Sequence, residues 1–192
     1  MPSLQEPPSI RPARSGDLPA LARITHERSG GDSETHRRSL ERFLARAATG
    51  RSLLLVAEVG GEVVGFGKCR YLVPPRREPP DPAPEAWYLA GLIVDSRFRR
   101  RGIGRALTQA RLRWAAERAD RVFYVANARN APSIALHAAL GFEELARGPS
   151  FADFTFEGGA GVLCRAVLRG PAGPGGPAAG GGGAPPRAGG SV

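Results

Sequence analysis

One stretch of this sequence constrains the fold more than any other, because an apolar run, an arginine-rich glycine turn and a helical pattern follow one another. The run WYLAGLIV (87–94) is typical of a buried strand, and RGIGRALTQARLRWAAERA (101–119) carries apolar residues at helical spacing. The first N–H groups of a helix have no internal partners, and glycine lets the backbone approach a ligand closely. The segment RFRRRGIGRAL (97–107) therefore predicts an anion-binding site at the start of a helix.

The charge of the chain is concentrated near this turn. The formal net charge is +9, and seven arginines without any acidic residue lie between positions 97 and 113. Clustered arginine also matches the phosphates of nucleic acid, and a nucleic-acid-binding module is the alternative that salt-sensitive DNA or RNA binding would support. Because the excess charge sits in one place, we expect a compact anion and no nucleic-acid partner.

The composition of the chain predicts one soluble domain over residues 1–169 and a disordered Gly/Pro-rich tail over 170–192. No stretch approaches the roughly 18 apolar residues of a membrane span, and the N-terminus lacks the apolar core of a signal peptide. We therefore expect a cytoplasmic protein that does not contact a membrane. The two cysteines, Cys69 and Cys164, lack metal-site spacing, so we expect both to be buried and no metal to be bound.

The periodicities along the chain predict an α/β fold, an α+β mixed sheet flanked by helices, in the order β α α β β β α β α β β. The first half of the chain is expected to contain a strand at 10–14, a helix capped by Asp17, a helix over 35–48, a hairpin of 52–59 and 62–72, and a loop over 73–86. The second half is expected to contain a strand at 87–94, a helix beginning near 102, a strand at 121–127 and a short helix capped by Asn130. An extended run from Phe142 and a last hairpin of 151–156 with 161–168 around Gly158 and Gly159 complete the expected fold. Two β-branched runs around Gly60 and Gly61 make the 52–72 hairpin the most secure of these.

The glycine turn does not match two common phosphate-binding motifs. A P-loop needs Gly-Lys-Ser or Gly-Lys-Thr, and neither sequence occurs in the chain. A dinucleotide fingerprint needs a third small residue for close helix packing, but Leu107 stands at that position after Gly102 and Gly104. The turn also follows three strands instead of opening a parallel sheet, which argues further against a dinucleotide site.

The sequence resembles the GCN5-related N-acetyltransferase (GNAT) superfamily in two places. VDSRFRRRGIGRAL (94–107) is similar to that family's acetyl-CoA motif, Arg/Gln-x-x-Gly-x-Gly/Ala, and ARNAPSIALHAALGF (128–142) is similar to its second signature. The resemblance covers residues 10 to 169. It implies a central, mostly antiparallel sheet of about seven strands flanked by about four helices.

The resemblance also implies acetyl-CoA as the co-substrate. Backbone N–H groups of the glycine turn would hold the pyrophosphate, Arg97 and Arg99 would meet the 3′-phosphate region, and main-chain groups of residues 92–94 would pair with the pantetheine arm. Two asparagines would lie near that arm. The implied coenzyme-binding residues are Leu92, Ile93, Val94, Arg99, Arg100, Arg101, Gly102, Ile103, Gly104, Arg105, Asn127 and Asn130.

Acetyl transfer to an amine needs a group that removes a proton from the ammonium and a group that protonates the departing thiolate. Many members of the family use a Glu near the fourth strand as the base and a Tyr on the late helix as the acid. Here His137 replaces that Tyr, and an imidazole can donate a proton near neutral pH. Tyr88 and Tyr124 are alternative donors, and Glu85 is the candidate base, directly or through water.

The acceptor is expected to be a primary amine of a small molecule, aminoglycoside-like or polyamine-like. Acidic residues in the segments that should surround it predict an acidic pocket: Asp32, Glu34, Glu78, Asp81, Glu85, Asp153 and Glu157. The alternatives are an acetyltransferase that acts on a protein N-terminus or lysine, and a member of the family that binds acyl-CoA without catalysis. The final hairpin is also compatible with a homodimer.

Overall fold

The computed structural model describes residues 7–76 and 81–168. Its elements are β1 (Ser9–Pro12), α1 (Leu18–Ser29), α2 (Ser33–Ala47), β2 (Ser52–Val59), β3 (Glu62–Leu72), β4 (Ala86–Val94), α3 (Ile103–Ala116), β5 (Arg121–Asn127), α4 (Ala131–Ala138), β6 (Glu143–Gly148), β7 (Ser150–Phe151), β8 (Phe154–Thr155) and β9 (Gly161–Val167). The expected order of strands and helices up to β6 is confirmed. The predicted tail over 170–192 lies outside the described residues.

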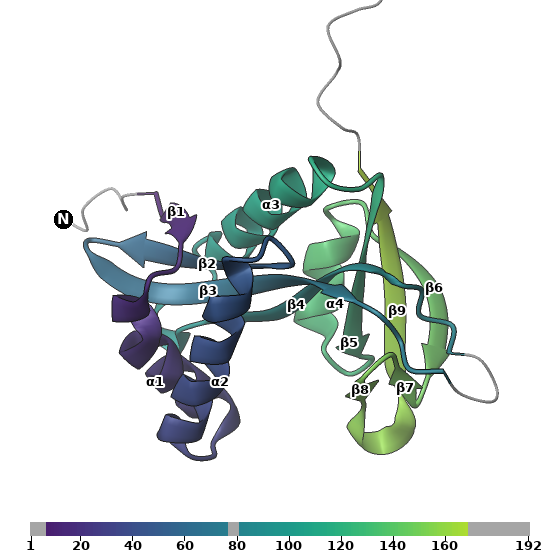
Figure 1. Cartoon of the computed structure of the whole chain (residues 1–192), viewed down its shortest axis with the longest axis horizontal. Coiled ribbons are helices and arrows are strands. Elements are labelled where there is room, and N and C mark those ends of the chain that lie inside the picture. Colours follow the sequence, from purple (N-terminus) through teal and green to yellow (C-terminus); the bar gives the residue numbers. More distant parts are fainter. Residues whose placement is uncertain (1–6, 77–80, 169–192) are drawn as a thin grey trace, which may run out of the picture.

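The main sheet has seven strands in the order β1-β2-β3-β4-β5-β9-β6 (Figure 1). Strands β4 and β5 pair in parallel, and the other neighbouring strands pair antiparallel. The predicted hairpin of β2 and β3 is confirmed with its expected bounds. No helix in the described part of the chain is both long and apolar enough to cross a bilayer.

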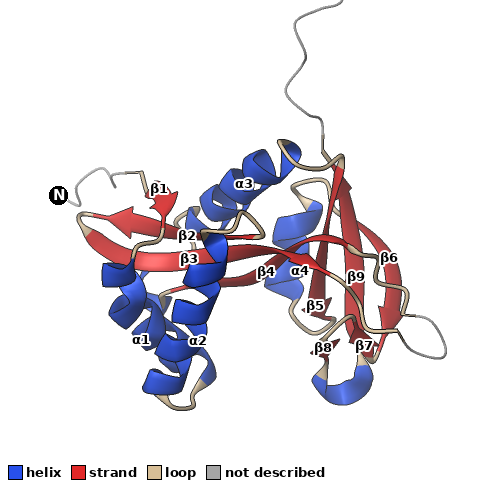
Figure 2. Cartoon of the chain, viewed as in Figure 1, coloured by secondary structure: helices blue, strands red, loops and turns tan. Residues whose placement is uncertain are grey.

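Helices cover both faces of the sheet, with α1 and α2 on one face and α3 on the other (Figure 2). Leu21, Ile24 and Leu40 of α1 and α2 pack with Val56 and Phe66 of the sheet. A second core joins side chains of α3 to the opposite face of β2 and β3 and to β5 and β9. The alternation of side chains along β2 and β3 supplies both cores, because successive residues of a strand point to opposite faces.

The predicted last hairpin is wrong. Phe151 pairs with Phe154 in the small β7-β8 sheet, whereas β9 pairs with β5 on one side and β6 on the other. Ala152 has a φ of +54°, and this turn folds the 151–156 segment back on itself. Strand β9 is buried along most of its length, which is typical of a central strand with two neighbours.

The two predicted helix caps have different outcomes. Asn130 caps α4 as expected, because its side-chain oxygen accepts a hydrogen bond from the Ser133 N–H at 3.4 Å. Asp17 precedes α1, but its carboxylate accepts a hydrogen bond from the Arg14 N–H at 2.7 Å and pairs with the Arg11 guanidinium at 2.8 Å. The cap expected from Asp17 is therefore absent, since a short 3₁₀ turn before the helix directs this carboxylate toward β1.

Candidate active site

A bulge in β4 creates the opening in which the site lies. Lys68 of β3 pairs with Ala90 and the preceding residue of β3 pairs with Leu92, so Gly91 is an extra residue in β4. Gly91 has a φ of +52°, and a Cβ there would lie 2.5 Å from Cε of Lys68. Pairing between β4 and β5 is confined to residues 88–89 and 123–124. The two strands therefore separate beyond residue 89, at the bulge, and residues 92–94 have no described strand partner on the β5 side.

A cleft of about 590 Å³ occupies this opening and is called the large cleft here. It is lined by Arg28, Leu92, Ile93, Val94, Phe98, Arg99, Arg100, Gly102, Ile103, Gly104, Arg105, Asn130, Pro132, Ser133 and Leu136. Most residues expected to bind the coenzyme are thus brought together. Arg101 and Asn127 do not line it: Arg101 packs over the ring of Phe98, and Oδ1 of Asn127 accepts a hydrogen bond from the N–H of Arg129 at 2.9 Å.

The glycine turn forms the polar wall of the large cleft. Gly102 is the N-cap of α3 with a φ of +77°, and the first α3 ladder bond runs from the Ala106 N–H to the Gly102 carbonyl at 2.9 Å. The intervening N–H groups have no intrahelical partners, and the helix dipole adds positive potential at the same place. The turn therefore offers backbone donors to an anion, as the sequence predicts.

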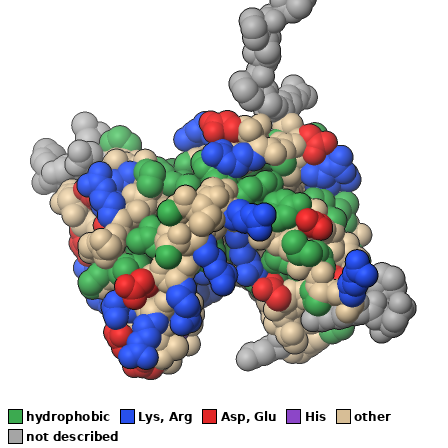
Figure 3. All heavy atoms as spheres, in the orientation of Figure 1, with side chains coloured by type: hydrophobic (Ala, Val, Ile, Leu, Met, Phe, Trp, Pro, Cys, Tyr) green, Lys and Arg blue, Asp and Glu red, His purple; other side chains and the backbone are tan. Residues whose placement is uncertain are grey.

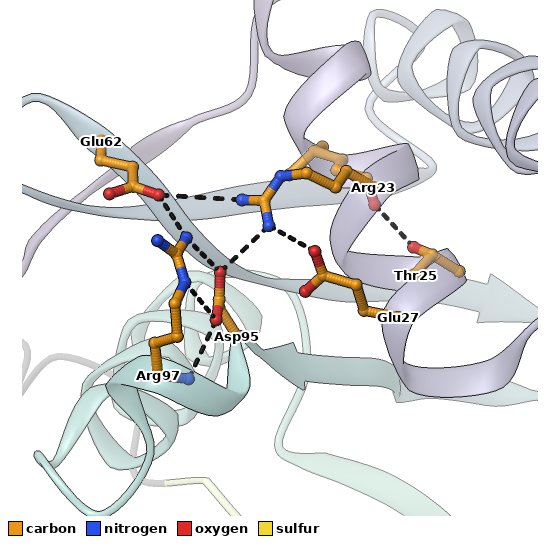
Figure 4. A network of polar contacts seen from close by, with 7 residues as sticks. Arg23, Thr25, Glu27, Glu62, Asp95 and Arg97 are labelled. Carbon is orange, nitrogen blue, oxygen red and sulfur yellow. Dashed lines mark hydrogen bonds and ion pairs between the residues drawn. The ribbon is translucent and has the colours of Figure 1, made fainter.

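A network of ion pairs holds the start of this turn against α1 and β3 (Figure 4). The Asp95 carboxylate pairs with Arg97 at 2.8 Å and with Arg23 at 3.3 Å, and Arg97 also pairs with Glu62 at 2.6 Å. The hydrogen bond from Arg97 lowers the pKa of Asp95 to about 2. Arg97 was expected near the 3′-phosphate region, but its guanidinium is engaged in this network and does not line the large cleft.

A second cavity of about 230 Å³, called the inner cavity here, adjoins the large cleft. The two share Arg28, Leu92, Ile93, Asn130 and Ser133 as lining residues. The inner cavity is completed by Ser29, Leu89, Ala90, Gly91, Arg111, Tyr124 and His137. It therefore connects the widened gap after the β4 bulge with polar side chains of α3, β5 and α4.

His137 lies in the wall of the inner cavity and is 2% exposed. Its ring stacks on Tyr124 with a centroid distance of 3.7 Å, and burial lowers its pKa to about 4. The ring is thus neutral at neutral pH, and Nδ1, 2.8 Å from the Ser133 carbonyl, must carry the hydrogen because a carbonyl only accepts. Nε2 is then an acceptor, and it has no partner in the described residues. This neutral state differs from the proton donor expected from the sequence.

Tyr124 and Ser133 form a hydroxyl pair at the junction of the two cavities. The Tyr124 hydroxyl donates to Oγ of Ser133 at 2.7 Å, and Ser133 lines both the large cleft and the inner cavity. Burial raises the pKa of Tyr124 to about 12, so the phenol stays protonated at neutral pH. The pair can therefore supply a hydrogen bond to a group bound at the junction.

Arg111 is a buried cation in the inner cavity, and its side chain is 1% exposed. Its guanidinium donates to the Lys68 carbonyl at 3.1 Å, to Oγ1 of Thr108 at 2.9 Å and to the Leu107 carbonyl at 3.3 Å. No described carboxylate pairs with it, and burial lowers its pKa to about 10. In the sequence Arg111 belongs to the arginine cluster, but its position four residues after the apolar Leu107 is the signal that it faces inward.

Two other predicted catalytic residues lie away from these cavities. Glu85 is exposed, and its carboxylate accepts a hydrogen bond from the Tyr71 hydroxyl at 3.0 Å. Tyr88 is buried, and its hydroxyl donates to the Pro84 carbonyl at 2.8 Å. Neither residue lines the large cleft or the inner cavity.

A third cavity of about 500 Å³ lies on the α2 face of the sheet and is called the basic pocket here. It is lined by Ser39, Arg42, Phe43, Arg46, Lys68, Arg70, Ala90, Gly91 and Phe154. Figure 3 shows Lys and Arg side chains along a notch between the lobe of α1 and α2 and the lobe of β7 and β8. Ala90 and Gly91 belong to both the basic pocket and the inner cavity.

The acidic pocket expected from the sequence does not form among the described residues. Asp32 caps α2 through the Thr35 N–H, Asp81 accepts hydrogen bonds from the N–H groups of residues 83 and 152, and Asp153 pairs with Arg70. Glu34 pairs with arginines of its own helix. Glu78 and the side chain of Glu157 lie outside the described residues.

The cysteines are buried and unpaired, as expected. Burial raises the pKa of Cys69 to about 12, which keeps this thiol protonated at neutral pH. In the two described segments, no three His, Cys, Asp or Glu side chains gather in a geometry that could hold a metal ion.

Comparison with protein families identifies a relationship over most of the folded region. The family model described as "Acetyltransferase (GNAT) family" matches residues 18–142. No curated protein sequence matches the chain.

Solved structures with the same fold include several acetyltransferases. A ribosomal-protein-alanine N-acetyltransferase from Brucella melitensis is 29% identical, with a TM-score of 0.63 over 83% of this chain and 99% of that one. The ribosomal-protein-S18-alanine N-acetyltransferase from Escherichia coli is 20% identical, with a TM-score of 0.61 over 88% and 97%. The putative acetyltransferase yncA from Salmonella typhimurium, solved with its cofactor acetyl-CoA, is 21% identical, with a TM-score of 0.63 over 88% and 98%.

Proposed function

Because the chain belongs to the GNAT family of acetyltransferases, we propose that it transfers the acetyl group of acetyl-CoA to a primary amine. The large cleft is the observation that carries this proposal. It joins the backbone donors of the glycine turn to the edge of β4 that has no described strand partner, and it continues into the inner cavity. A long molecule with an anionic middle and an amide-bearing arm fits this combination of surfaces.

In this arrangement the N–H groups at the start of α3 bind the pyrophosphate of coenzyme A. Arg99, Arg100 and Arg105 line the same wall and supply positive charge to the phosphates. The pantetheine amides pair with the main chain of residues 92–94 as an added strand would. The thioester then lies near the junction with the inner cavity, beside Asn130 and Ser133.

The reaction proceeds by attack of the neutral amine nitrogen on the thioester carbonyl carbon. The new C–N bond produces an oxyanion, and the buried charge of Arg111 in the inner cavity favours negative charge there. The C–S bond then breaks, the proton on nitrogen passes to water, and the thiolate leaves. The hydroxyl pair of Tyr124 and Ser133 donates a hydrogen bond to that thiolate before solvent protonates it.

The described walls of the three cavities contain no carboxylate that could act as the general base. Arg111 and Lys68, which lie on either side of the β4 bulge, provide another route to a neutral amine. Positive charges near an ammonium lower its pKa, because they disfavour the charged form. Proton loss to water before attack is therefore favoured in this site without a dedicated base.

The acceptor is a small molecule in our proposal, since the basic pocket of about 500 Å³ matches the size of small-ligand sites. A protein N-terminus is the second candidate. It is favoured by the 29% identity to the ribosomal-protein-alanine N-acetyltransferase from Brucella melitensis.

The test of the proposal is to follow thiol release from acetyl-CoA with a mixed panel of small amines and N-terminal peptides. We expect release that depends on the acceptor, and saturable acetyl-CoA binding in a calorimetric titration. Binding without release for every amine would leave a family member that binds acyl-CoA without catalysis. Absence of acetyl-CoA binding would contradict the proposal.

A further inference from the structure

The basic pocket carries more positive charge than its own surroundings neutralise. Its cations are Arg42 and Arg46 of α2 and Lys68 and Arg70 of β3. Asp153 pairs with Arg70 at 2.7 Å, but none of the described carboxylates pairs with the other three. The pocket therefore retains an excess of cations that an anionic ligand would balance.

Among the cations of the basic pocket, Lys68 is the one that lies against the β4 bulge. Its ammonium lies 5.3 Å from the centre of the Phe43 ring, and its stem passes over Gly91, where a Cβ would lie 3.2 Å from Nζ. Burial, and then the nearby charge of Arg70, lower the pKa of Lys68. A half-buried ammonium without a carboxylate is less favourable than a solvated one unless another group compensates its charge.

The basic pocket and the inner cavity meet at the β4 bulge, and the inner cavity is lined by residues of α1 as well as of α3. Lys68 lines the pocket on the α2 side, whereas a Cβ at the preceding Gly67 would meet Arg111 on the α3 side. Ala90 and Gly91 line both cavities, which therefore adjoin at the bulge. A molecule in the basic pocket can therefore present an amine at the bulge while its remaining atoms stay among the cations.

We propose that the basic pocket binds the acceptor, and that this acceptor is a small primary amine that also carries a carboxylate or a phosphate. This inference rests on the proposed acetyltransferase function and specifies its substrate class. The anionic group pairs with Arg42 and Arg46 at the mouth of the pocket, and the amine lies at the β4 bulge near Lys68. A polyamine or an aminoglycoside is disfavoured, because its additional ammonium groups would lie among four cations and no lining carboxylate.

The walls of the pocket also limit the size of the acceptor. Phe43 on the α2 side and Phe154 of β8 on the other side bound the space, and Arg70 packs over the Phe154 ring at 4.9 Å. The two elements come from opposite lobes of the notch in Figure 3. A small acidic amine fits between them, and its anionic group reaches the arginines of α2.

The test compares matched amines that differ in their anionic group. The panel contains an α-amino acid and its carboxamide, O-phosphoethanolamine and ethanolamine, spermidine, and a peptide that begins with alanine. Thiol release from acetyl-CoA gives kcat/KM for each. We expect at least one acidic member to exceed its neutral counterpart by about tenfold or more, since charge-assisted contacts are strong. The two pairs distinguish a carboxylate from a phosphate.

A matched pair of variants tests whether the anionic group of the acceptor contacts Arg42 and Arg46. Arg42→Gln with Arg46→Gln removes two charges from the pocket, whereas Arg37→Gln with Arg38→Gln removes two charges from the same helix outside it. We expect the first variant to raise KM for the acidic amine about tenfold while KM for acetyl-CoA stays unchanged. The second variant should keep both constants near those of the native chain.

The outcomes separate this inference from the proposed function. Preferred acetylation of a neutral amine, of spermidine or of the peptide would overturn the acidic acceptor and retain the acetyltransferase. Equal losses in both variants would show that net charge, and not the pocket, governs KM. If acetyl-CoA binds but no amine is acetylated, calorimetric titration of the acidic amines into the coenzyme-saturated protein tests whether the basic pocket binds them. Absence of binding would overturn the inference. If acetyl-CoA does not bind, the proposed function and this inference both fail.

Discussion

The large cleft and the basic pocket are both positively charged, but they are built in different ways. The anion-binding wall of the large cleft comes from one short segment, 98–105, and its donors include backbone N–H groups at the start of α3. The basic pocket gathers side chains from α2, β3, β4 and β8, between residues 39 and 154. The first site therefore depends on backbone conformation, whereas the second depends on which side chains the fold brings together.

The largest expected effect follows from changing the backbone of the glycine turn. In Gly102→Val, a β-branched residue must adopt a φ of +77°, although no neighbouring atom would clash with its Cβ. We expect KM for acetyl-CoA to rise about a hundredfold, because about 2–3 kcal/mol of strain would displace the N–H groups. Gly60→Val is the control, since this residue has a φ of +57° in the β2-β3 turn. A similar loss of acetyl-CoA affinity in both variants would contradict the role of the turn.

The β4 bulge, where the inner cavity and the basic pocket adjoin, is the next place to test. Gly91→Ala combines a φ of +52° with a Cβ 2.5 Å from Cε of Lys68, so the bulge and the lysine must both move. We expect kcat/KM to fall about thirtyfold for both substrates, corresponding to about 2 kcal/mol. Steady-state kinetics with each substrate varied in turn measures this loss. Gly60→Ala should leave both values unchanged, and a loss confined to acetyl-CoA would show that the bulge serves only the large cleft.

Substitution of Arg111 tests whether its positive charge contributes to the reaction or only to the stability of the fold. Arg111→Met keeps much of the side-chain volume but removes the cation from the inner cavity. We expect kcat to fall about tenfold, corresponding to about 1.4 kcal/mol, with a smaller change in either KM. Thermal unfolding provides the second readout. Retained kcat with a much lower Tm would indicate a structural role alone.

Substitution of Asp95 should weaken acetyl-CoA binding in the large cleft and leave acceptor binding in the basic pocket unchanged. Asp95→Asn weakens the network that holds the turn, and we expect KM for acetyl-CoA to rise about threefold, a loss of under about 1 kcal/mol. Because the folded pKa of Asp95 is lowered from 3.8 to about 2, its contribution to stability is present above pH 3.8 and is lost as the pH falls toward 2. Urea unfolding of both proteins across this range should show their difference shrinking. A constant difference would contradict the assignment.

The smallest effect concerns the protonation of His137. Its folded pKa of about 4 lies below the ordinary value of 6.5, so the unfolded chain takes up this proton first as the pH falls. The contribution of His137 to the free energy of unfolding should therefore decrease from pH 6.5 to pH 4. In His137→Phe this part of the pH dependence should disappear, as measured by urea unfolding. An unchanged slope would show that His137 is not buried in its neutral form.

Features that depend on neighbouring residues were mostly predicted from the sequence, with the Asp17 cap as the exception. The β2-β3 hairpin, the start of α3 after Gly102 and the Asn130 cap depend on neighbours a few positions away, and the structure contains all three. Pairings between distant segments were not predicted. Strand β9 has β5 and β6 as neighbours instead of the adjacent 151–156 segment, and this central position pairs the backbone groups along both of its edges.

The residues of the candidate site show the same division between local patterns and contacts of distant segments. The glycine turn, its arginines and the apolar strand before it are evident in the sequence, because these features require only local backbone preferences and periodicity. The three-dimensional arrangement was needed to show that His137 is buried and neutral, that Arg111 faces inward without a carboxylate, and that cations line the pocket where acidic residues were expected. Burial and the field of neighbouring charges are sums over residues that are distant in sequence, and the fold determines which residues enter those sums.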